Sequence, residues 1–216
     1  MHQNARTSLI WITIFAVAMA YIESAVVVYL RQIFYPQGFD FPLAGFEGEI
    51  NMILIEVGRE AATIIMLTAV GMLAGRSRIE KFAYLLYAFG VWDLFYYIWL
   101  KVFTGWPPSL LTWDILFLIP LPWVGPVLAP VLVSLALVAA ALWIIRREQI
   151  GADNRFPLWA WLSEIIAGLM IILSFIWDFK SITAGGYPHA FRWDLFALGW
   201  VGGCVLFVYQ MIRKRE

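Results

Sequence analysis

Long apolar blocks, separated by short polar segments, make up most of this 216-residue chain. About 20 consecutive apolar residues form a helix long enough to cross the hydrocarbon core of a bilayer. Blocks of this length predict helices near residues 8–30, 50–74, 82–103, 124–145, 157–177 and 193–212. We therefore expect an all-α polytopic integral membrane protein, with a six-helix transmembrane bundle forming one domain over residues 1–216.

Two places along the chain depart from a plain series of spans. The first block is longer than the apolar region of a cleaved signal peptide, and no small-residue cleavage site follows it, so we expect a retained span. Between Asp114 and Ile145 one continuous helix would be about 48 Å long, which exceeds the membrane. Pro120, Pro122 and Pro126 disfavour such a helix. We expect a short extra outer helix near 110–119, before the fourth span.

Composition agrees with a membrane protein and excludes several kinds of site. The chain is 62% hydrophobic and 14% charged, whereas soluble domains carry about 25% charged residues. The net charge is zero and no long basic run is present, so we expect no nucleic-acid partner. One cysteine is too few for an iron–sulfur cluster, and the two histidines lie too far outside the predicted spans for a haem held by paired histidines in the membrane. The cofactor stays unknown, with a divalent metal on oxygen ligands as one candidate.

The distribution of basic residues predicts the orientation. In the six-span arrangement four basic residues lie on the side of the 31–49 loop (Arg31, Lys101, Lys180 and Arg192), and ten on the other side (Arg6, Arg76, Arg78, Lys81, Arg146, Arg147, Arg155, Arg213, Lys214 and Arg215). Because basic loops remain in the cytoplasm, we expect both termini to be cytoplasmic and the 31–49 loop to be outside. We expect the location to be a plasma or inner membrane.

Two G-x-x-x-G pairs indicate where helices could pack closely, either within the chain or against a partner protein. Gly71 and Gly75 lie in the second predicted span, and Gly199 and Gly203 in the sixth. Such pairs let helices approach closely, either within one chain or between copies. The lipid bilayer is the expected environment, and a homo-oligomer or a larger membrane complex stays open.

Charged residues inside the predicted spans are the main candidates for function. With a rise of about 1.5 Å per residue, Glu23 and Glu56 both lie about 10 Å below the outer surface, while Glu60 and Asp93 lie near the midplane. Arg59 falls between these two levels. A charge at the centre of a span costs about 2.5–3.5 kcal/mol when it faces lipid. We therefore expect the first three spans to meet around Arg59, with these side chains facing inward.

The balance of charge in this group indicates what it could bind. Four carboxyl groups accompany one guanidinium, so some carboxyls must hold protons or the group must bind a cation. Tyr96 and Tyr97, close to Asp93 in sequence, are candidate hydrogen-bonding partners. The expected site comprises Glu23, Glu56, Arg59, Glu60, Asp93, Tyr96 and Tyr97, and a metal is one candidate ligand for its four carboxylates.

Three functions are compatible with such a site. The first is a small transporter with an outward-facing pocket that binds a cation or couples to protons. The second is a membrane-embedded enzyme, in which a metal held by carboxylates polarises a lipid-borne substrate. The third is a non-catalytic subunit of a larger membrane complex. No catalytic residue is predicted, because no span pairs a nucleophile with a base.

Overall fold

Long helices dominate the computed structural model, which describes residues 4–36, 50–152, 154 and 156–213. The helices are α1 (Ala5–Phe34), α2 (Ile50–Ala74), α3 (Arg78–Thr104), α4 (Leu128–Gln149), α5 (Leu158–Ile176), α6 (Phe179–Thr183) and α7 (Trp193–Arg213). Within these described residues, five segments are long and apolar enough to cross a membrane: α1, α3, α4, α5 taken together with α6, and α7. The predicted mostly helical class is confirmed, and these apolar helices are consistent with an all-α membrane protein. The 37–49 part of the expected outer loop lies outside the described residues.

Local sequence explains where α3 begins and ends. The Ser77 side chain accepts a hydrogen bond from the Glu80 amide at 3.1 Å, while the Glu80 carboxylate accepts one from the Arg76 amide at 2.7 Å. This reciprocal arrangement resembles a capping box, which satisfies amides that have no partner inside the helix. At the other end Gly105 adopts a left-handed conformation with φ of 72°. Glycine tolerates that conformation without strain, so the helix stops there.

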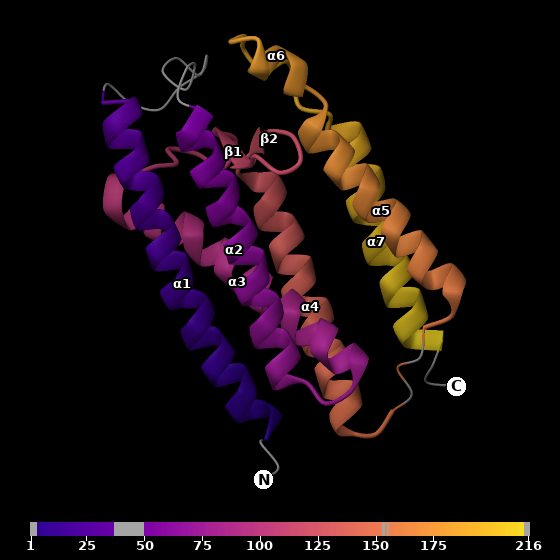
Figure 1. Cartoon of the computed structure of the whole chain (residues 1–216). Coiled ribbons are helices and arrows are strands. Elements are labelled where there is room, and N and C mark those ends of the chain that lie inside the picture. Colours follow the sequence, from indigo (N-terminus) through magenta and orange to yellow (C-terminus); the bar gives the residue numbers. More distant parts are fainter. Residues whose placement is uncertain (1–3, 37–49, 153, 155, 214–216) are drawn as a thin grey trace.

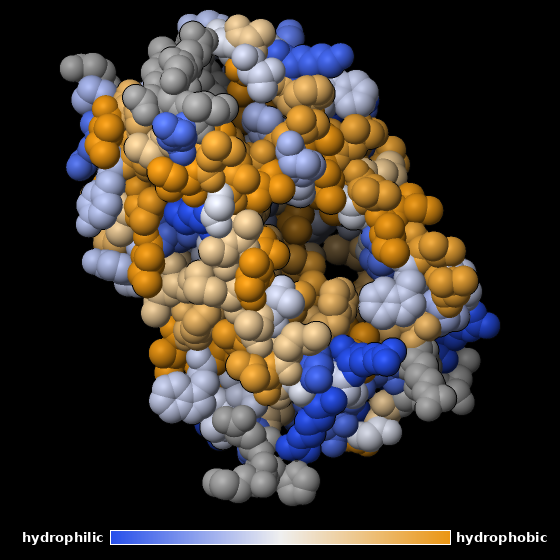
Figure 2. Space-filling view, viewed as in Figure 1, coloured by the Kyte–Doolittle hydropathy of each residue, from blue (hydrophilic) through white to orange (hydrophobic). Residues whose placement is uncertain are grey.

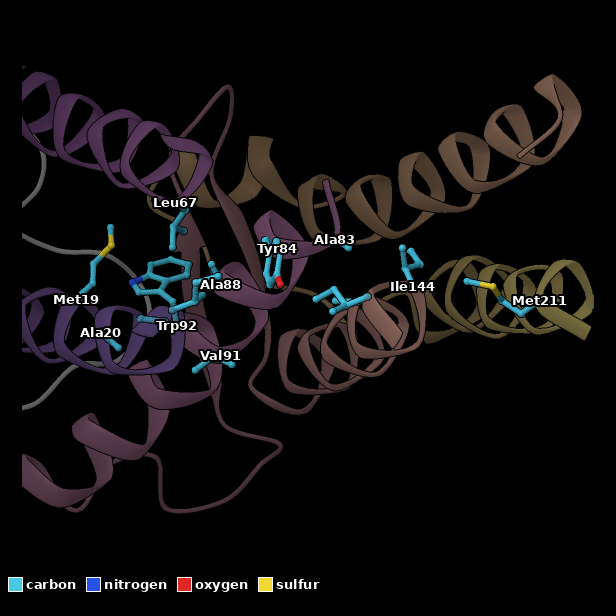
Figure 3. Close-up of a cluster of buried hydrophobic side chains, with 14 residues drawn as sticks. Met19, Ala20, Leu67, Ala83, Tyr84, Ala88, Val91, Trp92, Ile144 and Met211 are labelled. Carbon is cyan, nitrogen blue, oxygen red and sulfur yellow. The ribbon is translucent and has the colours of Figure 1, made fainter. Parts of the chain in front are cut away.

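Helix α3 is the central element of the larger group of helices. It packs against α1, α2 and α4, and the buried core includes Met19, Leu67, Trp92 and Ile144, one from each of these helices (Figure 3). Small residues, such as Ala20 and Ala88, are fully buried where the helices come close together. The core thereby fixes the relative positions of the three helices that carry the predicted intramembrane charges.

The prediction of a short outer helix near 110–119 is wrong. Strands β1 (Trp113–Phe117) and β2 (Trp123–Pro126) form an antiparallel hairpin there, with Asp114 opposite Gly125. Pro120 and Pro122 lie in the connection between the strands. Proline disfavours the helical conformation of the residue before it, so Ile119 and Leu121 are kept out of a helix. Because of the hairpin, α4 begins at Leu128, four residues later than the predicted start at residue 124.

Helices α5 and α7 form a separate pair beside the larger group (Figure 1). A Cβ atom added at Gly199 would lie 2.6 Å from the Ala167 carbonyl oxygen, and one added at Gly203 would lie 3.3 Å from the Ala167 side chain. The second G-x-x-x-G pair therefore serves packing within the chain. The pair contacts the rest of the molecule mainly through β2 and α4.

The ends of the elements divide the molecule into two poles. Helix α1 begins and α7 ends at one pole, while the β-hairpin and α6 lie at the other (Figure 1). Apolar side chains cover much of the visible face between the poles, and hydrophilic ones gather toward both poles (Figure 2). This distribution fits a protein surrounded by lipid at its middle.

Candidate functional site

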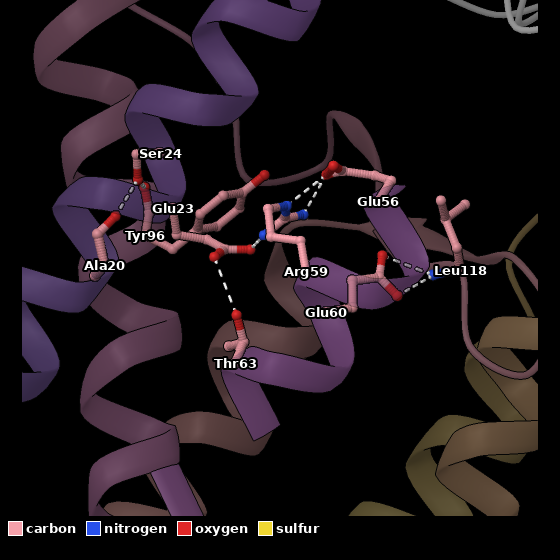
Figure 4. A network of polar contacts seen from close by, with 9 residues as sticks. All are labelled: Ala20, Glu23, Ser24, Glu56, Arg59, Glu60, Thr63, Tyr96 and Leu118. Carbon is pink, nitrogen blue, oxygen red and sulfur yellow. Dashed lines mark hydrogen bonds and ion pairs between the residues drawn. The ribbon is translucent and has the colours of Figure 1, made fainter. Parts of the chain in front are cut away.

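Arg59 joins two helices through ion pairs. Its guanidinium contacts the Glu23 carboxylate of α1 and lies 2.5 Å from the Glu56 carboxylate, one turn earlier on α2 (Figure 4). Thr63 donates a further hydrogen bond to Glu23 at 3.3 Å. Both carboxylates are at least nine-tenths buried. The predicted contacts of Arg59 with Glu23 and Glu56 are confirmed.

Glu60 binds the backbone of the hairpin rather than Arg59. Its two carboxylate oxygens accept hydrogen bonds from the Leu118 amide at 3.0 and 2.9 Å (Figure 4). The residue is 5% exposed. Since a buried amide without a partner is costly, Glu60 provides the hairpin with a partner that the second strand does not supply. It thereby attaches the hairpin to α2.

Asp93 lines the same cavity as Arg59 but hydrogen-bonds to a different group. The Ser134 hydroxyl of α4 donates a hydrogen bond of 2.7 Å to its carboxylate, and Asp93 is 8% exposed. Of the four predicted acids, Glu23 and Glu56 form ion pairs with Arg59, whereas Glu60 and Asp93 line the same cavity but bond to other groups. The reason is that α4 and the hairpin supply nearer partners for Asp93 and Glu60.

A second ion pair, which the sequence did not predict, lies at the end of α1. Arg31 contacts Asp114 of β1 at 2.9 Å and lies over the Trp106 ring, 3.9 Å from its centroid. Asp114 is 1% exposed. Burial raises the pKa of Asp114 to about 6, while Arg31, the Ile115 amide and the Tyr97 hydroxyl oppose the rise. The one sequence signal was an acidic residue within the apolar run "TWDILF".

These polar groups line a cavity of about 110 Å³ between α1, α2, α3 and the hairpin. It has room for a few water molecules or one small ion. Five carboxyl-bearing side chains line it (Glu23, Glu56, Glu60, Asp93 and Asp114), together with the two guanidiniums of Arg31 and Arg59. Carboxyl groups therefore outnumber guanidiniums by three in what we call the carboxylate cavity.

Aromatic hydroxyls complete the wall of the carboxylate cavity. Tyr96 and Tyr97 both line it, as the sequence suggested. Within the part of the chain that the structure describes, the Tyr97 hydroxyl and Asp114 Oδ2 are buried without a hydrogen-bond partner of ordinary geometry. Buried polar atoms of this kind favour a guest that can bind them.

The arrangement does not form the metal site that the four carboxylates suggested. Among the described residues no three His, Cys, Asp or Glu side chains are grouped so as to hold a metal ion. Glu60 is turned toward the Leu118 amide and Asp93 toward Ser134, so neither joins Glu23 and Glu56 in one coordination shell. A divalent metal shared by Glu23, Glu56, Glu60 and Asp93 is therefore not supported.

Comparison of the chain with family models, with curated proteins and with solved structures finds no match.

Proposed function

We propose that this chain is a six-span membrane protein whose outward-facing carboxylate cavity binds a small monovalent cation or exchanges protons. The observation that carries the proposal is the excess of three carboxyl groups over guanidiniums around one small cavity. Buried like charges cannot all remain ionised without a counter-ion. Protons or a bound cation supply the missing positive charge, and Glu60 and Asp93, which form no ion pair among the described residues, are the groups that would hold it.

The six-span arrangement takes α2 as the second crossing. At 25 residues, α2 is about 37 Å long, and it lies alongside α3 within the bundle (Figure 1). Six crossings return the chain to its starting side, which agrees with α1 beginning and α7 ending at one pole. The excess of basic residues at that pole favours a cytoplasmic location for it. The carboxylate cavity, near the hairpin, would then face outward.

The contacts of the carboxyl groups also favour a second candidate, a non-catalytic subunit of a larger membrane complex. Each carboxyl group of the cavity has at least one protein partner, as in a cluster whose purpose is to hold helices together. A metal-dependent enzyme is less well supported, because the carboxylates of the described residues are not grouped for a metal. The two remaining candidates differ in whether a cation changes the properties of the purified protein.

Thermal unfolding in detergent separates these candidates. The measurement compares sodium, potassium and ammonium chloride with N-methylglucamine chloride at equal ionic strength, for wild type and Asp93→Asn. A cation that binds only the folded protein stabilises it by about 2.7 kcal/mol at one hundred times its dissociation constant. We expect at least one small cation to raise the wild-type melting temperature saturably and to have little effect on Asp93→Asn. If all four salts act alike on wild type at several pH values, the cavity is a structural ion-pair cluster.

A further inference from the structure

A second and larger cavity separates the α5–α7 pair from α3 and α4. Its volume is about 460 Å³, and it extends from Ile79 and Phe156 toward the hairpin residues Phe117 and Trp123. Figure 2 shows the hollow between the two parts of the molecule. We call this space the lateral groove. It is lined by different residues from the carboxylate cavity except near Asp93 and at Leu116 and Phe117, where the two adjoin.

The wall of the lateral groove is apolar and rich in aromatic rings. Phe82, Phe89, Trp161, Trp200 and Phe207 all contribute to it. An aromatic wall of this kind accommodates hydrocarbon or aryl groups, and the faces of its rings attract organic cations. Shape and polarity alone would also admit the acyl chain of a lipid.

The charges in the lateral groove discriminate between these guests. Among the described residues, the lining includes two acidic side chains, Asp93 and Glu164, and no lysine, arginine or histidine. The Asp93 carboxylate accepts a hydrogen bond from the Ser134 hydroxyl. Glu164, in contrast, has a buried oxygen, Oε1, without a hydrogen-bond partner among the described residues. An ionisable group at membrane depth is costly unless something pairs with it, and none of the described residues that line the groove carries a positive charge.

We propose that the lateral groove is a binding site for a lipophilic organic cation. The charged centre of the guest would face Glu164, and its apolar groups would contact the aromatic wall. Charge complementarity selects this guest over a neutral acyl chain, since a cation compensates the charge of the carboxylate and an acyl chain does not. The inference does not depend on the cation site proposed above, because Glu164 does not line the carboxylate cavity.

Binding of tetraphenylphosphonium, a lipophilic cation, tests the assignment. The protein is placed in nanodiscs of zwitterionic lipid, and binding is measured by equilibrium dialysis with empty nanodiscs subtracted. Uncharged triphenylphosphine oxide serves as the matched neutral ligand. We expect saturable binding of the cation to wild type and an affinity about tenfold or more lower for Glu164→Gln. The neutral ligand should bind both proteins equally.

Two further variants separate the lateral groove from the carboxylate cavity. Ala140→Phe places a ring in the groove and should weaken binding of both ligands, whether or not Glu164→Gln folds well. Glu56→Gln alters only the carboxylate cavity and should leave tetraphenylphosphonium binding unchanged. The proposal is overturned if wild type and Glu164→Gln bind the cation equally, if Ala140→Phe has no effect, or if Glu56→Gln abolishes binding.

Discussion

At the scale of single residues, the contacts of Arg59 explain why three charged residues, Glu56, Arg59 and Glu60, lie close together within the apolar helix α2. Its guanidinium compensates Glu56 on the same helix and Glu23 on α1, so a group that would be costly in lipid becomes a link between two helices. The spacing of Glu56 and Arg59, three residues apart, places both on one face. That part of the site follows from helical geometry and could be predicted from the sequence.

Replacing Arg59 by Met should strongly destabilise the protein near neutral pH. The change leaves Glu23 and Glu56 buried without their positive partner, and breaking a buried pair in this way costs about 3–5 kcal/mol. Adding Glu56→Gln to the same variant removes one unpaired charge and should restore part of the loss. Melting temperatures in detergent for the three proteins, at pH 7 and pH 5, check this. Three equal values at pH 7 would show that the ion pairs contribute nothing.

Asp114 should make stability depend on pH. Burial raises the pKa of this carboxyl from 3.8 to about 6 in the folded protein, so the folded state binds the proton more tightly than the unfolded chain. The resulting stabilisation is fully present below pH 3.8 and is lost as the pH rises through 6. Between pH 7 and pH 4 the stability of wild type relative to Asp114→Asn should therefore increase, by an amount on the order of 3 kcal/mol.

Denaturant unfolding of both proteins across this pH range measures the difference between their free energies of unfolding. The contributions of the other carboxyl groups are nearly the same in both proteins and largely cancel in this difference. The groups that face Asp114 are Arg31, Asp93, Tyr96 and Tyr97, and all are retained in the variant. Parallel pH profiles for wild type and Asp114→Asn would contradict the prediction.

At the scale of elements, the hairpin is the feature that closes the carboxylate cavity. Residues 115–118 line the cavity, and the hairpin is attached on one side by Glu60 and on the other by Arg31. Both attachments join residues that are far apart in sequence. The hairpin therefore joins Arg31 of α1 and Glu60 of α2 through β1 and the residue that follows it.

Loss of the Glu60 contact should loosen the hairpin without unfolding the helices. In Glu60→Ala the Leu118 amide loses a charged acceptor, a contact worth about 1.5–3 kcal/mol. Hydrogen exchange at Leu118 should accelerate by about ten- to one-hundredfold, while exchange in α3 should remain unchanged. Thr68→Ala, on the same helix but bonded only to the Ile64 carbonyl, is the control. Equal protection of Leu118 in all three proteins would mean that Glu60 does not hold the hairpin.

Helix α2 could be predicted from the sequence, whereas the hairpin could not. The long apolar block at 50–74 is compatible only with a helix, and α2 has these bounds. The shorter run "TWDILFLIPLPW" is different, because a short apolar run fits a buried strand as well as a helix. The ion pair of Arg31 with Asp114 joins residues 83 positions apart. No local pattern predicts such a contact, since it depends on how α1 and the hairpin pack.

At the scale of the whole molecule, two groups of polar contacts occupy opposite poles. The carboxylate cavity lies near the hairpin. At the other pole Arg147 of α4 donates hydrogen bonds to Asn154 at 3.1 Å and to the Met211 carbonyl of α7 at 3.2 Å. Arg147 thus connects the α5–α7 pair to the larger group at the pole where α1 begins. The lateral groove lies between these attachments.

The proposed orientation predicts which pole can be labelled from outside the cell. In a Cys204→Ser background, Ser109→Cys places a thiol on an exposed residue at the hairpin pole, and Ile150→Cys places one on an exposed residue at the opposite pole. A membrane-impermeant maleimide applied to intact cells should label the first variant only. Labelling of Ile150→Cys alone would reverse the orientation and place the carboxylate cavity on the cytoplasmic side.

Isothermal titration calorimetry of the purified protein with a small monovalent cation tests the central claim most directly. Titrations in two buffers of different ionisation enthalpy report both the binding heat and the number of protons exchanged, so they detect a bound cation and a released proton alike. We predict one saturable site in wild type for sodium, potassium or ammonium, none for N-methylglucamine, and a site lost in Asp93→Asn. Heats no larger than those of N-methylglucamine for all three cations in both buffers would contradict the claim.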